Sequence, residues 1–205
     1  MSSVQVRDDV VNEVVRFHGH MCPGLAIGIR AAEIALQEIG PHAQDEEVVC
    51  VTETDMCAVD AIQYLTGCTF GKGNLIHLDH GKNAFTFYRR SDGKGIRIVT
   101  RPDAFGPQDP EREVLRRKIR EGVATSKERE RFWALQQERA RMILQAGLDE
   151  LFEVKSPTLP LPSKARIHRS LPCAVCGETV METRVRLFDG QSLCITCFEA
   201  RERRW

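Results

Sequence analysis

The 205-residue sequence has no apolar run that approaches the roughly 18 residues of a membrane-spanning helix. Its first residues, Met1 to Asp9, contain no apolar segment of the kind found in secretory signal peptides. Basic and acidic residues balance at 29 each, so the chain has no overall excess of positive charge for phosphate groups. We therefore expect a cytoplasmic protein, in which thiols stay reduced and favour metal binding over disulfides.

A nucleotide-binding phosphate loop is also missing. The stretch that comes nearest, Gly67 to Gly73, has one residue too few between its first two glycines, and Lys72 is followed by glycine instead of Ser or Thr. We interpret this stretch as a turn. The sequence shows no ferredoxin-type cysteine spacing, which argues against an iron–sulfur cluster.

Half of the eight cysteines gather near the C-terminus, as Cys173-Ala-Val-Cys176 and Cys194-Ile-Thr-Cys197. The 17 residues between the pairs give the spacing of a tetrahedral Cys₄ zinc site, in which a hairpin brings the second pair beside the first. Four protein ligands leave no open position on the metal, so we predict a structural zinc ion. Two redox-active pairs or two disulfides are the alternatives.

The pattern around these cysteines predicts a treble-clef finger. Residues 180–187 are expected to form a strand and residues 192–193 its return, joined by the turn Phe188-Asp-Gly-Gln191. Cys197 is expected to open a short helix over residues 198–204.

The preceding part of the chain predicts an α+β domain, in which helices cover one face of a small sheet. After a short helix over residues 10–17, an α-β-α-β-β-β order is expected, with elements over residues 23–39, 48–54, 57–65, 74–78 and a hairpin of 84–89 with 95–100. Further helices are predicted at 109–121 and 125–147, and a semi-rigid Pro-rich segment at 156–163. We place the core domain at 1–152, the linker at 153–170 and the finger at 171–205.

The segment His18-Gly-His-Met-Cys22-Pro23 combines metal-ligating and nucleophilic side chains at a helix start. Pro23 suits the first position of a helix, which places Cys22 at the N-cap, where the helix dipole and unpaired N–H groups favour the thiolate. If the chain approaches the helix in an extended form, His18, His20 and Cys22 point to one side.

A second thiol, Cys57, is expected in the first turn of the next helix, after Asp55 as N-cap and before Asp60. If the two helix starts converge, one cleft would hold His18, His20, Cys22 and Cys57. This set suits zinc or another borderline-soft transition metal, with room for water or substrate. It also suits a reactive cysteine with a histidine base, with Cys22, His20 and Cys57 as catalytic candidates. The alternative is structural: a capped helix start with a buried thiol and a hydrogen-bonded histidine.

Four stretches resemble the FmdE family, which is named after a component of formylmethanofuran dehydrogenase. They are Phe17-His-Gly-His-Met-Cys-Pro-Gly-Leu-Ala-Ile-Gly28, Cys57-Ala-Val-Asp-Ala-Ile-Gln63, Gly67-Cys-Thr-Phe-Gly-Lys-Gly-Asn-Leu75 and Asp79-His-Gly-Lys-Asn-Ala-Phe-Thr-Phe-Tyr88. The resemblance covers residues 10 to 150 and implies an α+β core with a mixed four-stranded sheet, a homodimer, and a functional site at His18, His20, Cys22 and Cys57, with Asp60 nearby. The finger resembles the TraR/DksA type of Cys₄ zinc finger.

These features predict a metal-binding protein with structural zinc in the finger and a second transition metal in the core cleft. We expect one-carbon or redox-linked chemistry there, or an accessory role for a molybdenum or tungsten formylmethanofuran dehydrogenase-like enzyme. Both an enzyme and a metal carrier are compatible with these residues.

The alternative is a regulatory or interaction protein whose finger binds nucleic acid or a protein partner. From Lys155 onward nine basic residues face five acidic ones. Four zinc-bound thiolates offset about two of these positive charges, so we do not expect nucleic acid as a partner.

Overall fold

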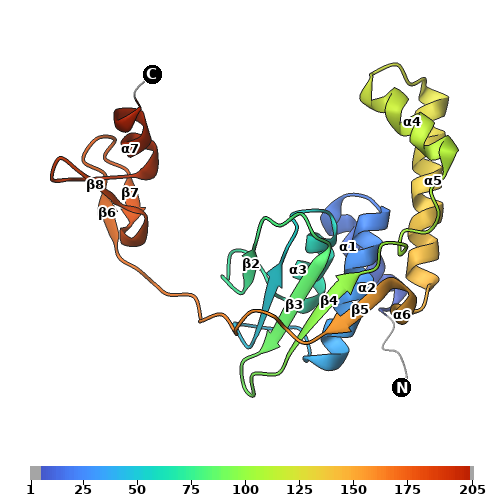
Figure 1. The fold of residues 1–205 in the computed structure, drawn as a ribbon, viewed down its shortest axis with the longest axis horizontal. Helices are drawn as coiled ribbons and strands as arrows, with labels where there is room; N and C mark the ends of the chain where they lie inside the picture. Colours follow the sequence, from blue (N-terminus) through green and yellow to red (C-terminus); the bar gives the residue numbers. More distant parts are fainter. Residues whose placement is uncertain (1–5, 204–205) are drawn as a thin grey trace. The chain divides into compact units, whose positions relative to one another are not determined.

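The computed structural model describes residues 6–203. The chain divides into two compact units, Met1–Lys164 and Ala165–Trp205. We treat the two units separately (Figure 1). Within the described residues, no helix is both long enough and apolar enough to span a membrane.

The first unit, residues 1–164, carries an α+β fold, as the sequence predicts. Its helices are α1 (Asp8–His18), α2 (Pro23–Glu38), α3 (Ala58–Thr66), α4 (Pro110–Arg120), α5 (Ser126–Gln145) and α6 (Leu148–Leu151). Its strands are β1 (Val48–Thr52), β2 (Leu75–His77), β3 (Ala84–Arg89), β4 (Gly95–Thr100) and β5 (Phe152–Lys155).

The sheet is mixed and has the strand order β2-β1-β3-β4-β5. β1 and β2 are parallel, and the other neighbours are antiparallel. The fifth strand, β5, is absent from the predicted four-stranded sheet. It pairs with β4, with Phe152 opposite Thr100, so the sheet continues three residues past the boundary expected at 152. Only Phe152 of this short strand is buried, so the sequence carries no alternating pattern to reveal it.

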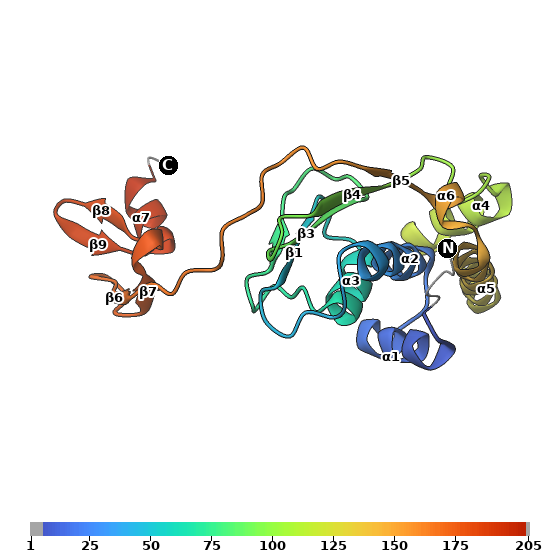
Figure 2. The same cartoon turned by 90° about the horizontal axis from the view of Figure 1, so that it is seen from below.

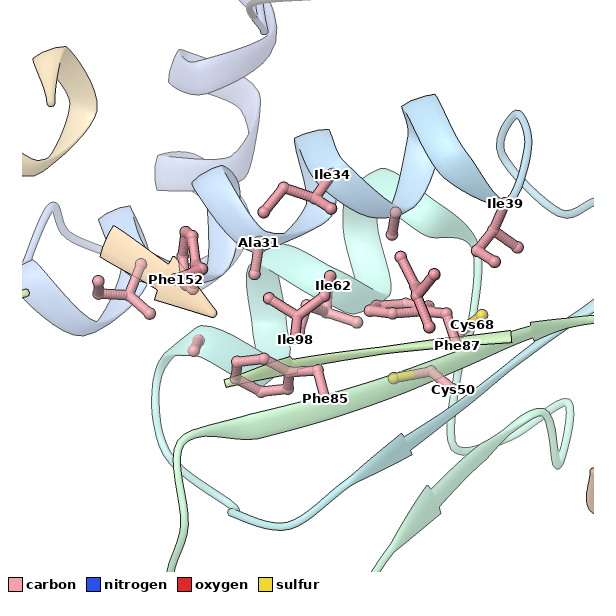
Figure 3. Close-up of a cluster of buried hydrophobic side chains, with 14 of the residues drawn as sticks. Ala31, Ile34, Ile39, Cys50, Ile62, Cys68, Phe85, Phe87, Ile98 and Phe152 are labelled. Atoms are coloured by element: carbon pink, nitrogen blue, oxygen red, sulfur yellow. The ribbon is translucent and has the colours of Figure 1, made fainter. Parts of the chain in front are cut away.

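Helices α2 and α3 cover one face of the sheet (Figure 2). Alternation along the strands directs Phe85 and Phe87 of β3 and Cys50 of β1 into this layer, where they meet Ile62 of α3 and Ala31 of α2 (Figure 3). These side chains have almost no exposed surface. The packed layer fixes how the two helices lie on the sheet, and therefore where their N-termini lie.

Glycine lets α2 and α3 approach closely. A Cβ atom built on Gly28 of α2 would lie 2.3 Å from the backbone oxygen of Ala58, the first residue of α3. One turn earlier, a Cβ on Gly24 would lie 3.2 Å from Cβ of Cys57. The two glycines therefore allow the start of α3 to rest against the start of α2, which brings Cys57 near Cys22.

The Pro-rich segment 156–163 lies against the other face of the sheet, whereas the sequence predicted a spacer. The hydroxyl of Tyr88 donates to the carbonyl of Leu159, and Arg90 Nη1 donates to the carbonyl of Pro162 at 2.6 Å. Gly95 makes room for Pro157, because a Cβ there would lie 2.8 Å from the proline Cγ. The segment thereby helps to bury Tyr88, whose apolar neighbours are Val49 and Val51.

The second unit is the finger. It contains β6 (Ser170–Pro172), β7 (Thr179–Met181), a 3₁₀ turn η1 (Glu182–Arg184), β8 (Arg186–Phe188), β9 (Gln191–Leu193) and α7 (Ile195–Glu202). The predicted strand 180–187 is thus interrupted by η1. Asp189 and Gly190 have positive φ, as expected for the turn between β8 and β9.

The helix of the finger begins earlier than predicted. Cys194 is its N-cap and its sulfur accepts the backbone N–H of Cys197 at 3.4 Å, so Cys197 lies in the first turn instead of opening the helix. This placement turns both sulfurs of the second pair to the same side. The predicted last residue, Arg204, lies outside the described residues.

Candidate metal centre

Three helix ends meet at the start of the core domain. His18 is the last residue of α1, Cys22 is the N-cap of α2 and Cys57 is the N-cap of α3. One ligand atom from each of these residues lies within 4.8 Å of the others. The structure therefore brings together three of the four residues that the sequence assigned to the cleft.

The turn between α1 and α2 decides which histidine joins the thiols. Gly19 ends α1 with a left-handed φ of 97°, so the chain folds back instead of running extended, and the predicted extended approach is wrong. His18 Nε2 lies 4.0 Å from Cys22 Sγ. His20 is outside the cluster: its ring lies beside His18, with centroids 4.7 Å apart, and meets the Trp133 ring edge-on at 5.8 Å.

Cys22 occupies the N-cap of α2, as the sequence predicts. Its sulfur accepts the backbone N–H of Leu25 at 3.3 Å, and Pro23 occupies the first helical position. The sulfur therefore lies at the N-terminus of the helix, where the backbone N–H groups and the helix dipole present partial positive charge.

Cys57 occupies the N-cap that the sequence assigned to Asp55. A turn precedes the helix, in which Val59 N–H donates to Met56 C=O at 2.9 Å. The helix therefore begins two residues later than it would with Asp55 as the N-cap. Burial raises the pKa of the Cys57 thiol, and a negative charge on Cys22 raises it further. Two thiolates so close together repel each other, and a divalent cation between them would remove this cost.

Asp60 orients the histidine. Its Oδ2 lies 2.6 Å from Nδ1 of His18, whose side chain is only 10% exposed. A carboxylate at this distance holds the proton on Nδ1, which leaves the lone pair of Nε2 directed to the side of Cys22. One nitrogen and two sulfur donors fit zinc or a similar ion, and three protein ligands leave a fourth position for water or substrate.

A cavity of about 380 Å³ opens beside the thiols. One wall consists of His20, Cys22 and Cys57, and the opposite wall comes from α4 and α5, through Arg112, Arg116, Trp133 and Gln136. The sequence predicted only a solvated charged face for these helices, because no short motif connects them to the cysteines. A larger cavity of about 700 Å³, between α5 and the loop after β4, contains neither histidine nor cysteine in its lining.

Cys50 and Cys68 lie away from this cluster, in the core between helices and sheet. Burial raises the pKa of Cys68 to about 11 and raises that of Cys50 well above its ordinary value. They are therefore inert packing residues, as predicted for Cys50.

The finger cysteines form a second cluster. Cys173, Cys176, Cys194 and Cys197 each offer a sulfur within 4.8 Å of the others. Backbone N–H groups, first that of Cys176 and then that of Cys194, lower the pKa of Cys173 to about 6. Four thiols without an open position fit a structural zinc ion.

Comparison with known families agrees with this geometry. Residues 17–153 match the family model described as "FmdE, Molybdenum formylmethanofuran dehydrogenase operon". The chain belongs to the FmdE family. Residues 166–203 match the prokaryotic DksA/TraR C4-type zinc finger, so both resemblances seen in the sequence are confirmed.

Two relatives of this FmdE-family chain illustrate its range. A protein of Archaeoglobus fulgidus, named "Probable S-adenosyl-L-methionine-binding protein", is 34% identical over 193 residues, which is 88% of this chain and 50% of the relative. The chain therefore spans about half the length of that relative. A crystal structure of a tungsten formylmethanofuran dehydrogenase FmdE-like protein from Syntrophus aciditrophicus matches with a TM-score of 0.63 and 25% identity, covering 96% of this chain and 94% of that one.

Proposed function

We propose that this FmdE-family protein is a metalloprotein with a reactive centre in its core, separate from the zinc of the finger. Its ligands are His18, Cys22 and Cys57, and the best fit is zinc. The observation that carries the proposal is the convergence of these three donors within 4.8 Å of one another, with both cysteines lining a cavity. The open fourth position would admit a substrate, which supports one-carbon chemistry at a zinc ion, while redox-linked chemistry would require a redox-active transition metal on the same ligands.

The side chains around the centre have distinct tasks in this proposal. Cys22 and Cys57 supply the negative charge that holds a divalent ion, while the Asp60 carboxylate keeps His18 in the ligating tautomer. A bound zinc ion supplies Lewis acidity toward a carbonyl or water oxygen. His20 lines the cavity without joining the cluster, which suits it to hold or accept a proton from a bound substrate.

The name of the S. aciditrophicus relative supports an accessory role for a molybdenum or tungsten enzyme, and we propose this as one use of the centre. The homodimer implied by the family resemblance stays a prediction. S-adenosylmethionine appears only in the name of the A. fulgidus relative, of which this chain covers 50%, and the proposal does not include its binding.

Metal stoichiometry tests the proposal. The wild type is expected to contain about two metal ions per chain, and the Cys22→Ser/Cys57→Ser variant about one, because the finger keeps its own four ligands. Elemental analysis of protein purified without chelator or added metal gives the count. A matched control is Cys68→Ser, since its hydroxyl can still donate to the Val48 carbonyl, which the thiol contacts at 3.6 Å.

If the wild type and the double variant both contain one zinc ion, the core centre does not exist in solution. Cys22 and Cys57 would then be interpreted as reactive thiols that act without a metal ion. Mass spectrometry with a thiol-alkylating reagent would show Cys22 or Cys57 reacting before the buried Cys50 and Cys68.

A second prediction concerns Asp60. The Asp60→Asn variant is expected to bind the core metal about 10- to 100-fold more weakly, because the amide cannot hold the Nδ1 proton of His18 as a carboxylate does. Competition with a chromophoric chelator measures this affinity. The control is Asp55→Asn, an exposed carboxylate close in sequence that does not cap α3. Equal affinity in the Asp60→Asn variant and the wild type would rule out this orienting role.

The charge of the finger does not favour nucleic acid as its partner. Residues 165–205 contain seven arginines and five acidic residues, and a zinc ion with four thiolates adds about two negative charges. Arg169 pairs with Glu182 at 2.8 Å, which reduces the free positive charge further. We therefore propose a structural or protein-binding role for the finger.

A further inference from the structure

The wall of the cavity opposite the thiols carries a nearly buried guanidinium group. The side chain of Arg112 is 12% exposed, although it comes from an otherwise hydrophilic helix. Its Nη1 donates to Gln136 Oε1 at 3.3 Å, and its Nη2 lies 3.6 Å from Glu113 Oε1. Its Nε is buried and has no hydrogen-bond partner among residues 6–203. Buried N–H groups are rarely left unpaired, so the hydrogen-bonding capacity of this guanidinium group is not fully used by the protein.

The charges around Arg112 leave one positive charge in excess at this wall. Arg116 lines the same cavity, and its Nη1 lies 3.3 Å from Glu113 Oε1, the oxygen that Arg112 also approaches. One glutamate thus serves two guanidinium groups. Arg139 and Asp109 also act on Arg112, but their opposite charges offset each other.

The metal centre at the opposite wall carries no excess of positive charge. Two thiolates and a neutral imidazole balance a divalent ion, and the Asp60 carboxylate beside His18 adds one negative charge. The positive excess is therefore confined to the wall of Arg112 and Arg116, where one net charge matches a singly charged carboxylate better than a doubly charged phosphate. Guanidinium groups are also well suited to carboxylates, because their N–H groups can pair with both oxygens.

The remaining lining is apolar. Trp133, which is 49% exposed, and Met56, which is 60% exposed, both line the cavity, together with Phe105. The volume of about 380 Å³ is at the lower end of the range for small-molecule sites. A ligand with a short apolar body would cover the indole face and leave its charged group to the arginines.

We propose that this cavity binds a small monocarboxylate, with the carboxylate on Arg112 and Arg116 and the apolar body against Trp133. The inference rests on the proposed function, because it names the class of molecule that the same centre would act on. Arg112 and Arg116 are substrate-binding residues in this scheme.

Trp133 provides a readout that does not require a metal. The chain has two tryptophans, Trp133 and Trp205. In a Trp205→Phe variant, tryptophan fluorescence therefore reports on Trp133 alone. The full-length protein is titrated with phenylacetate and with phenylacetamide, which has nearly the same shape and no charge. We expect phenylacetate to bind about tenfold more tightly, the usual effect of a charged hydrogen bond.

Variants assign this preference to the arginines. Arg112→Gln and Arg116→Gln are each expected to remove most of the preference for phenylacetate and to leave phenylacetamide binding unchanged. Arg117→Gln is the matched control, since this exposed arginine of the same helix does not line the cavity. Arg116 is itself half exposed, so its substitution tests the proposal even if the Arg112 variant folds poorly.

The inference would be overturned if the wild type bound phenylacetate and phenylacetamide equally well, or if the Arg116→Gln substitution weakened the binding of both probes equally. It would also be overturned if inorganic phosphate displaced phenylacetate at a lower concentration than acetate does. The Cys22→Ser/Cys57→Ser variant separates this inference from the proposed function. Persistence of the preference for phenylacetate in that variant supports the carboxylate site, whereas its metal content reports only on the metal centre.

Discussion

Replacing Gly28 with alanine is expected to lower the free energy of unfolding of the core by about 3 kcal/mol, near the upper end of what overpacking usually costs. The new methyl group would lie 2.3 Å from the backbone oxygen of Ala58, and backbone cannot move aside as a side chain can. Helix propensity alone predicts the opposite sign, a gain of about 1 kcal/mol for alanine in a helix. Urea denaturation followed by circular dichroism measures the difference.

The same substitution is expected to weaken the core metal site. If the start of α3 moves away from α2, Cys57 moves with it, since Cys57 directly precedes Ala58. Gly71→Ala is the matched control, because nothing lies within 4 Å of a Cβ at this exposed position and its φ is not positive. A Gly28→Ala protein as stable as the wild type, with unchanged metal content, would contradict the close approach of the two helices.

Removal of zinc is expected to unfold the finger while leaving the core domain folded. Among its described residues, only Cys173 and Leu193 are buried apolar side chains, which is too little apolar burial for a stable unit. Structural zinc contributes about 10–16 kcal/mol to the folding of comparable finger peptides. Hydrogen–deuterium exchange with and without a chelator should show loss of protection over residues 170–202 and retained protection in β3 and β4.

Two substitutions within the same cysteine pair sharpen this test. Cys197→Ala removes a ligand and is expected to reproduce the effect of the chelator. Thr196→Ala, at the exposed position between the two cysteines, is expected to leave protection unchanged. A finger that keeps its protection after zinc loss has been verified would show that the metal does not hold it together.

Local signals predicted most of the elements. The 3.6-residue periodicity and capping residues gave the helices, and the hairpin of β3 and β4 matches the predicted residues 84–89 and 95–100. Cysteine spacing was sufficient for the finger, because the two C-x-x-C pairs need only a short hairpin between them. Pro23 likewise located Cys22 at an N-cap, since proline favours the first position of a helix.

Features that depend on a single backbone torsion or on tertiary contacts were not predictable. The assignment of His18 and not His20 to the thiol cluster follows from the left-handed conformation of Gly19, which reverses the chain after α1. Strand β5 forms by pairing with the edge of β4. The sequence of β5 has no alternating apolar pattern that would predict a strand. Arg112 and Arg116 lie on α4, which packs against α5, and α5 in turn packs against α2. These tertiary contacts place the two arginines at the cavity.

The late position of β5 in the chain has a consequence during synthesis. β4 ends at Thr100, and its partner strand does not begin until Phe152. At about 5–20 residues per second, the hydrogen-bonding edge of β4 is without its partner for several seconds after it forms. An open edge of this kind is a template for pairing with a neighbouring chain. The helices α4 and α5 must therefore be translated before the nascent domain can protect itself from aggregation on the ribosome.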